Sequence, residues 1–253
     1  MADLKTPEAA ATRPAPASAA GAPVLSVENL QAWYGESHIL HGIDFNVNAG
    51  EVVTLLGRNG AGKTTTLKSV MGMIGKRTGS VRFNNQETIR TSSDRIARQG
   101  IAFCPEERGI FASLDVRENL LLPPIVRSGG LSLDQIFDLF PNLKERLNSQ
   151  GTKLSGGEQQ MLAIARILRT GARFLMLDEP TEGLAPVIIQ QIGHTIARLK
   201  SEGFTILLVE QNFRFAATVA DRFFIVEHGK IIDGFASSEL QANMTKLHTY
   251  LGV

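Results

Sequence analysis

The chain has 253 residues, enough for one large α/β domain or two small ones, and its 43% hydrophobic and 20% charged residues are an ordinary globular balance. Lysine and arginine number 26 against 25 aspartates and glutamates, so the net charge of +1 gives no reason to expect a nucleic-acid partner. A single cysteine, Cys104, excludes an intrachain disulfide and fits a reducing compartment. No apolar run approaches the ~18 residues of a membrane span, so any function at a membrane would need another chain to cross it.

The first residues differ in composition from the rest. Residues 1–23 are rich in alanine and proline, and they carry almost no large apolar side chain that could offset the entropy of ordering. A signal peptide is the alternative, because Ala-Pro-Ala resembles a cleavage site, but the continuous apolar segment of such a peptide is missing. We therefore expect a disordered tail over residues 1–23 and one folded domain over residues 24–253.

From residue 24 onward, short apolar runs alternate with helical patterns. The expected strands are residues 24–27, 51–56, 79–83, 101–104, 173–177 and 205–209. Several of these runs are almost continuously apolar, as expected of strands buried on both faces of a parallel sheet. Residues 223–226 and 230–235, on either side of His228-Gly229, predict a late β-hairpin.

The alternation is interrupted between about residues 110 and 165. Asp115 with Glu118, and Ser132 with Gln135, have the spacing of capping boxes, which predicts two helix starts. These four residues are expected to cap helices and to do no chemistry. The segment is typical of a helical insertion into an α/β core.

Residues 57–64 have the pattern of a phosphate-binding loop, lying between the expected strand at 52–56 and a helical pattern at 64–73. Glycines let backbone N–H groups surround phosphate oxygens at a helix N-terminus. Lys63 would reach the β- and γ-phosphates of ATP, and the Thr64 hydroxyl would bind Mg²⁺. The alternative is a glycine-rich turn without a ligand. The residues expected to contact ATP are Gly57, Arg58, Asn59, Gly60, Ala61, Gly62, Lys63, Thr64 and Thr65.

Two carboxylates, Asp178 and Glu179, end the apolar run of residues 173–177. The carboxyl end of a parallel strand faces the crevice in which open α/β sheets bind ligands. We expect Asp178 to hold Mg²⁺, directly or through water, and Glu179 to act as the general base on the attacking water. The alternative is a solvated strand end that happens to be acidic.

A second anion site is predicted at residues 154–159, Leu-Ser-Gly-Gly-Glu-Gln, before a helical pattern at 160–169. We call this stretch the signature segment. One ATP does not need two such sites in one chain, whereas two chains that face each other head to tail would use both. The alternative is an ordinary serine cap followed by a glycine turn. The signature residues expected to contact nucleotide are Ser155, Gly156, Gly157, Glu158 and Gln159.

With these motifs at these spacings, the sequence from about residue 24 to the end resembles the ABC ATPase family. The resemblance implies an α/β P-loop NTPase with a RecA-like, mainly parallel core, an antiparallel β subdomain and an inserted α-helical subdomain. It also implies that ATP lies between two protomers. Tyr34 matches the aromatic residue that stacks on adenine, although a packed edge aromatic is the alternative, and residues 182–186 match the loop that contacts the partner protomer.

A narrower resemblance is carried by residues 34–40, 140–146, 155–164 and 181–186, which are similar to LivF-type ATP-binding subunits of high-affinity branched-chain amino acid importers. It implies a peripheral position at the cytoplasmic face of the inner membrane. The implied partners are a second, different ATP-binding subunit, two permease subunits and, indirectly, a periplasmic substrate-binding protein. Urea or short-chain amide importers, and a soluble ABC-type ATPase of iron–sulfur assembly, are the alternatives.

The sequence departs from the family pattern at residues that would face the phosphates. Glu106 stands where most members have glutamine, and Gln211 stands where most have histidine. Glu106 can still bind Mg²⁺ or its water, because carboxylate oxygen is a good hard ligand. Gln211 can donate a hydrogen bond to the γ-phosphate but brings no positive charge, so we expect weaker stabilisation of the transition state there.

Overall fold

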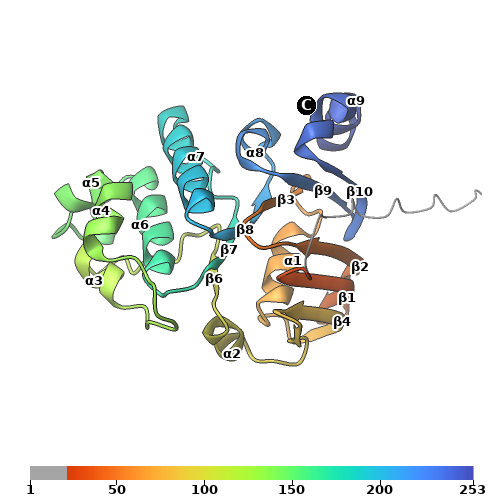
Figure 1. The fold of residues 1–253 in the computed structure, drawn as a ribbon, viewed down its shortest axis with the longest axis horizontal. Coiled ribbons are helices and arrows are strands. Elements are labelled where there is room, and N and C mark those ends of the chain that lie inside the picture. Colours follow the sequence, from red (N-terminus) through yellow and green to blue (C-terminus); the bar gives the residue numbers. More distant parts are fainter. Residues whose placement is uncertain (1–21, 253) are drawn as a thin grey trace, which may run out of the picture.

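The computed structural model describes residues 22–252, so the expected tail lies outside the described residues except for its last two positions. Within this range the chain forms two sheets, with the larger sheet between the smaller one and a group of helices (Figure 1). The larger sheet has the order β10-β9-β3-β8-β7-β6. Its strands are β3 (Val52–Leu56), β6 (Ile101–Cys104), β7 (Phe174–Asp178), β8 (Thr205–Glu210), β9 (Arg222–Glu227) and β10 (Lys230–Ala236).

The larger sheet is the parallel core that the apolar runs predict. β3 pairs in parallel with β8 and β9, β7 pairs in parallel with β6 and β8, and only the hairpin of β9 and β10 is antiparallel. Every residue of β3, β7 and β8 is buried, because helices or the second sheet cover both faces. The carboxyl ends of β3 and β7 therefore open at the same edge.

The smaller sheet is antiparallel and has the order β2-β1-β4-β5. Its strands are β1 (Leu25–Tyr34), β2 (Ser37–Val47), β4 (Lys76–Phe83) and β5 (Gln86–Glu87). The sequence predicted only the first part of β1 and the second part of β4, and it missed β2. The reason is local: β1 and β2 change register around Asn29 and Leu30, and Asn29 has a φ of 47°, so the apolar alternation breaks where the strands bulge.

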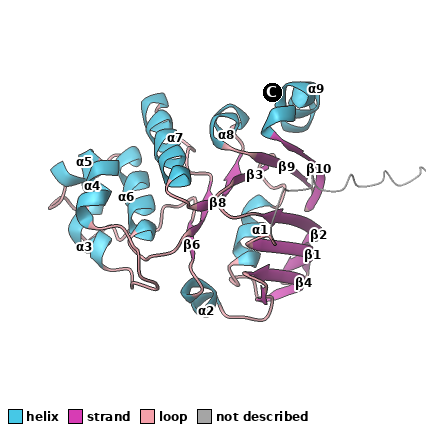
Figure 2. Cartoon of the chain, in the orientation of Figure 1, coloured by secondary structure: helices cyan, strands magenta, loops and turns pink. Residues whose placement is uncertain are grey.

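Helices cover both faces of the larger sheet (Figure 2). α1 (Lys63–Val70) lies between the two sheets, and its Leu67 and Val70 are buried with residues of β1, β2 and β3. The predicted helix over 64–73 is too long, because the chain turns at Gly72 with a φ of 76°. The remaining helices around the core are α2 (Ser93–Arg98), α7 (Pro186–Ser201), α8 (Phe213–Val219), the 3₁₀ helix η2 (Ser237–Glu239) and α9 (Leu240–Leu251).

The inserted segment folds into helices at the end of the molecule opposite the smaller sheet (Figure 1). They are α3 (Val116–Leu121), α4 (Leu133–Leu139), α5 (Pro141–Glu145), the 3₁₀ helix η1 (Gly151–Lys153) and α6 (Gly156–Leu168). Both predicted capping boxes are confirmed, at Asp115 and at Ser132. Among the described residues, no helix combines the length and the apolar character needed to cross a membrane.

Helix α6 begins earlier than the sequence predicted. Ser155 is its N-cap, with its Oγ accepting a hydrogen bond from the Glu158 N–H at 3.3 Å while the Glu158 Oε2 accepts from the Ser155 N–H at 2.7 Å. The helical pattern at 160–169 therefore extends back to Gly156, because this third capping box holds two glycines in the first turn. Ser155 and the following glycines thus present the N-terminal end of a 13-residue helix.

Candidate functional site

The phosphate loop runs from the end of β3 to the start of α1, as the sequence predicted. Gly62 is the N-cap of α1 and has a φ of 106°, which disfavours any residue with a Cβ. A Cβ at Gly57 would lie 2.4 Å from the carbonyl oxygen of Val226, and one at Gly62 would lie 2.9 Å from Leu40 Cδ2. The loop is therefore packed against β9 and β2, and glycine is required where it touches them.

Lys63 is buried at the centre of this loop. Its Nζ donates hydrogen bonds to the carbonyl oxygens of Gly57 at 2.8 Å and Arg58 at 3.1 Å. The same Nζ lies 3.0 Å from Glu179 Oε1, and the two side chains are only 3% and 8% exposed. A buried charge needs such partners, because removing it from water without them costs several kcal/mol. The lysine and the glutamate predicted from distant segments are therefore in direct contact.

Asp178 ends β7 beside the first turn of α1. Its Oδ1 accepts a hydrogen bond from Thr64 Oγ1 at 3.0 Å, and its Oδ2 is buried and has no hydrogen-bond partner among the described residues. Burial raises the pKa of Asp178 to about 6, and the charges of Glu179 and Glu106 act in the same direction. A nearby cation would stabilise the charged form and satisfy the unpartnered oxygen.

The described residues, 22–252, contain no group of three or more His, Cys, Asp or Glu side chains arranged to hold a metal. Mg²⁺ does not require such a group, because proteins usually bind it through one or two carboxylates together with substrate phosphates and water. The unpartnered Asp178 Oδ2 and the Thr64 hydroxyl are hard oxygen donors of the kind that Mg²⁺ prefers. The residues at this point of the sheet therefore fit that ion.

Glu179 follows Asp178 in a left-handed conformation with a φ of 45°. Its N–H donates to the Val209 carbonyl oxygen at 3.0 Å, which continues the pairing of β7 with β8 for one residue. The unusual φ turns the side chain out of the strand direction and toward Lys63. Conformations of this kind are costly for residues other than glycine and gather at functional sites.

A pocket of about 360 Å³ opens beside these residues. Its lining includes nine of the predicted site residues: Tyr34, Asn59, Gly60, Gly62, Lys63, Thr64, Thr65, Glu106 and Glu179. Tyr34 is 49% exposed at its edge. Ile39 and Glu182 also line the pocket and were not predicted as site residues. Residues from the smaller sheet, from α1 and from three loops thus converge on one cavity.

Three residues of the predicted phosphate loop do not line this pocket. Gly57 contributes only its carbonyl oxygen to Lys63, and Ala61 O accepts a hydrogen bond from the Gly229 N–H at 2.8 Å. Arg58 points away and donates from Nε to the Tyr250 carbonyl oxygen at 3.0 Å, in the last turn of α9. These three residues hold the loop in place through contacts on the side away from the pocket.

Gln211 lies next to the first pocket. Gln211 directly follows β8 and is exposed. It lines a second pocket of about 350 Å³, which shares Glu179 and Glu182 with the first. Sequence reasoning missed the buried Glu210 beside it, whose Oε1 accepts from Thr181 Oγ1 at 2.8 Å. Burial raises the pKa of Glu210 to about 7, against the lowering effect of that hydrogen bond. Glu210 ends a buried strand, as Asp178 does. The same sequence feature that predicted Asp178 as a site residue could therefore have predicted Glu210.

The signature segment lines neither of these pockets. It sits at the start of α6, where Gln159 Nε2 donates to the carbonyl oxygens of Gly151 and Leu154, each at 3.2 Å. Burial tends to raise the pKa of Glu158, but hydrogen bonds from Ser155 and Arg146 outweigh it and hold the pKa below its usual range. The structure therefore brings the phosphate loop, Asp178, Glu179, Glu106 and Tyr34 together and leaves the signature apart from them.

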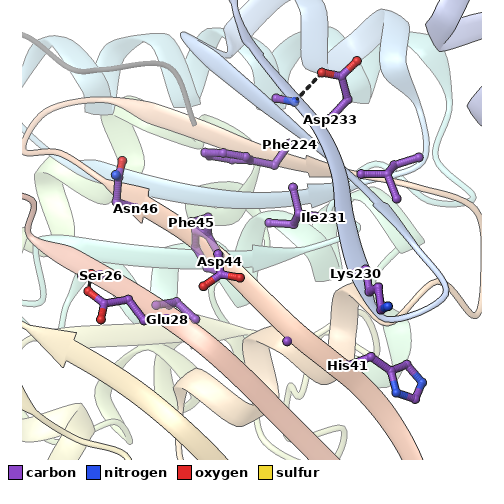
Figure 3. A pocket seen from close by; sticks show the side chains of 14 residues that line it. Ser26, Glu28, His41, Asp44, Phe45, Asn46, Phe224, Lys230, Ile231 and Asp233 are labelled. Carbon is purple, nitrogen blue, oxygen red and sulfur yellow. Dashed lines mark hydrogen bonds between the residues drawn. The ribbon is translucent and has the colours of Figure 1, made fainter. Parts of the chain in front are cut away.

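A further pocket of about 530 Å³ lies between the two sheets, where β1 and β2 face β10 (Figure 3). Phe45 and Ile231 are among its apolar lining residues, and Glu28, Asp44 and Asp233 are among its polar ones. None of the predicted site residues lines it. It is therefore separate from the phosphate pocket.

Comparison with known proteins agrees with this geometry. Residues 40–182 match the ABC transporter family. The chain is 41% identical over 232 residues to the high-affinity branched-chain amino acid transport ATP-binding protein BraG of Pseudomonas aeruginosa, covering 90% of this chain and 100% of that protein. It is 33% identical over 234 residues to the lipopolysaccharide export system ATP-binding protein LptB of Escherichia coli, covering 90% of this chain and 97% of LptB.

The fold agrees as well. A crystal structure of a nucleotide-free ATP-binding cassette from an ABC transporter superposes with a TM-score of 0.79 at 24% identity, covering 92% of this chain and 99% of that one. The predicted fold class, a P-loop core with an antiparallel sheet and inserted helices, is confirmed. The matched segment, the similarity to transport ATP-binding proteins and the shared fold together place this chain in the ABC transporter family of ATP-binding proteins.

Proposed function

We propose that the chain is the ATP-hydrolysing subunit that powers import of branched-chain amino acids through a separate membrane permease, at the cytoplasmic face of the inner membrane. The observation that carries this proposal is the buried contact between Lys63 and Glu179, at 3.0 Å, inside a pocket lined by the phosphate loop. The similarity to BraG over 90% of the chain supports the assignment to amino acid transport.

ATP would bind with its phosphates at the N-terminal end of α1. There the first-turn N–H groups and the helix dipole favour negative charge, and Lys63 adds a full positive charge. The lysine would exchange its contacts with the Gly57 carbonyl and with Glu179 for phosphate oxygens. Tyr34, half exposed in the lining of the same pocket, would stack on the adenine ring.

Mg²⁺ would be held by Thr64 and Asp178, with Glu106 from the lining of the same pocket as a further oxygen ligand or a partner for a bound water. The ion would neutralise charge on the phosphate oxygens. Asp178 offers a carboxylate oxygen for the ion, since its Oδ2 has no hydrogen-bond partner in the part of the chain that the structure describes.

Glu179 is our candidate for the general base. Release from Lys63 would free its carboxylate to accept a proton from the water that attacks the γ-phosphate. Gln211, which lines the adjoining pocket, would donate a hydrogen bond to the γ-phosphate without adding a charge.

The separation of the signature segment from the phosphate pocket supports pairing of two ATP-binding chains. If two such chains face each other head to tail, the α6 N-terminus of each can reach the nucleotide of the other. We infer that the partner is a second, different ATP-binding subunit, so that the two nucleotide sites are unequal. The segment 182–186 borders both pockets through Glu182 and would contact that partner.

A contact surface for the permease is offered by a largely apolar groove of about 420 Å³ between the core and the helical insertion. Its lining includes Met71, Met73, Ala97, Phe103, Pro124 and Val126. Met73 in this lining is 53% exposed, and Leu122 and Ile125, next to the groove in the sequence, are 51% and 69% exposed. Exposed apolar residues gathered around a groove are typical of a protein contact site, and an apolar helical segment of the permease fits this one.

Co-purification and uptake measurements test the proposal. The tagged chain would be purified in detergent from membranes of the cells that naturally produce it. Proteins that co-purify with it would be identified by mass spectrometry. We expect a second ATP-binding chain and two permease subunits, and ATP-dependent uptake of leucine, isoleucine or valine in proteoliposomes. Uptake of urea or acetamide instead would change the substrate class. If the isolated chain is a fully active ATPase and no membrane protein co-purifies with it, the proposed role in transport is wrong.

A further inference from the structure

The loop that follows Glu106 joins the phosphate pocket to the signature segment. Glu106 lines the pocket, and two residues later Arg108 Nη1 donates a hydrogen bond to Gln159 Oε1 at 2.9 Å. The guanidinium also lies over Gly156, since a Cβ there would be 3.4 Å from Arg108 Nη2. An arginine from a loop of the core therefore rests on the first turn of α6.

The backbone is shaped to make this contact. Arg108 has a φ of 65°, in the left-handed region that residues other than glycine seldom adopt, and its N–H donates to the Pro105 carbonyl oxygen at 2.9 Å. The next residue, Gly109, also has a positive φ, 61°. A strained turn of this kind persists only where surrounding contacts hold it, and the contact with Gln159 is one of them.

Gln159 in turn is fixed from its other side. Its amide nitrogen donates to the Gly151 and Leu154 carbonyl oxygens, each at 3.2 Å, so both ends of the amide are bonded. The side chain thereby ties three segments together: the Glu106 loop through Arg108, η1 through Gly151, and the residue before the Ser155 cap. Removing Arg108 would leave the amide oxygen without a charged donor and the first turn of α6 with one fewer restraint.

We propose that Arg108 is a positioning residue for the nucleotide bound by the partner chain: by holding Gln159, it sets the angle at which Ser155 and the α6 N-terminus are presented across the dimer. This inference rests on the head-to-tail pairing in the proposed function. Arg108 thus acts on the nucleotide site of the partner chain, although Glu106, two residues before it, lines the nucleotide site of this chain.

The competing explanation is that Arg108 only stabilises the loop. Other contacts already do so: Arg166 Nη1 donates to the Gly109 carbonyl oxygen, and its guanidinium lies 4.9 Å from the Phe111 ring centroid. Phe111 N–H also donates to Asn119 Oδ1 at 2.8 Å. Because these restraints remain in an Arg108 variant, the loop should keep its fold and the change should be confined to the signature.

The test uses the purified transporter containing the full-length chain, with Arg108→Ala alone and combined with Lys63→Ala. Lys63→Ala disables this chain's own site, so the remaining turnover comes from the partner's site, which uses this chain's signature. In that background we expect Arg108→Ala to raise the apparent KM for ATP about tenfold, the factor expected for loss of one charge-assisted hydrogen bond. Nucleotide affinity of the isolated Arg108→Ala chain, measured with a fluorescent ATP analogue, should equal that of the wild type.

Three comparisons make the outcome decisive. Arg108→Lys, which keeps one charged donor, should recover most of the loss, and Arg108→Ala with Gln159→Ala should be no worse than either single variant. Arg198→Ala, which removes an arginine paired with Glu202 at 3.1 Å on the surface of α7, is the matched control and should leave KM unchanged.

An unchanged KM in the Lys63→Ala background would overturn the proposal and leave the proposed function standing. A loss of nucleotide affinity in the isolated Arg108→Ala chain would also overturn it, because the arginine would then serve its own site. If the wild-type transporter fails to hydrolyse ATP, the proposed function falls and this inference falls with it.

Discussion

Glu179→Gln is expected to slow hydrolysis strongly and, at the same time, to tighten ATP binding. The glutamate is 8% exposed and lies 3.0 Å from Lys63, which is also held by two backbone carbonyl oxygens. Glutamine keeps the shape and one acceptor oxygen, so the nucleotide-free chain should lose only about 1.5–3 kcal/mol of stability, the range for one charged hydrogen bond. In a chain of this size that is a fall in melting temperature of about 3–12 °C.

The same substitution releases Lys63 for phosphate. Since ATP no longer competes with a carboxylate for the lysine, its affinity should rise about fivefold, and saturating Mg-ATP should raise the melting temperature of the variant by more than that of the wild type. Loss of a general base should reduce turnover at this chain's own site by about 10²- to 10⁴-fold, leaving an ATP-bound dimer on size-exclusion chromatography. Thermal melts, ATP titrations and a phosphate-release assay measure each effect.

Glu202→Gln, at the exposed end of α7, is the matched control and should change none of these quantities. Wild-type turnover in Glu179→Gln would place the general base elsewhere. Weaker ATP binding in the variant would refute the idea that the carboxylate and the phosphates compete for Lys63.

Three further results are expected. Lys63→Ala should abolish tight ATP binding or turnover at this chain's own site, because no other cation occupies the described pocket lining; unchanged ATPase activity in the assembled transporter would contradict it. Deletion of residues 2–22 should leave ATPase activity and melting temperature nearly unchanged, since that segment has few apolar side chains to bury. A fall in melting temperature of more than a few degrees would show that the segment packs on the folded domain. Gln211→His should raise the transporter's turnover and Gln211→Ala should lower it, by up to ~2–4 kcal/mol of barrier; equal turnover in all three would remove Gln211 from the chemistry.

The parts of the site that depend on local chemistry could be predicted from the sequence. The phosphate loop, the paired carboxylates at the end of β7 and the capped helix starts each rest on neighbours within a few residues, and the chain folds them as expected. That parallel strands open at one edge also predicted that Asp178 and Thr64 would meet, which they do at 3.0 Å. The family resemblance supplied Tyr34, Glu106 and Gln211, which composition and spacing alone would not have indicated.

The rest depends on contacts between distant segments. The ion pair of Lys63 and Glu179 joins residues 116 positions apart, and nothing in either local pattern specifies it. The bond from Arg108 to Gln159 and that from Arg58 to α9 are of the same kind. β2 was missed because bulges break its alternation, and the extra turn of α6 was missed because glycine propensity argues against a helix where a capping box imposes one.

The most direct test of the central claim is uptake of radiolabelled leucine by proteoliposomes that contain the complete transporter, with ATP supplied on the side that this subunit occupies. With the wild-type chain, uptake should depend on Mg-ATP, and with Glu179→Gln it should stop although ATP still binds. Leucine uptake that persists with Glu179→Gln, or that proceeds without ATP, would contradict the claim that hydrolysis at this pocket powers the import of branched-chain amino acids.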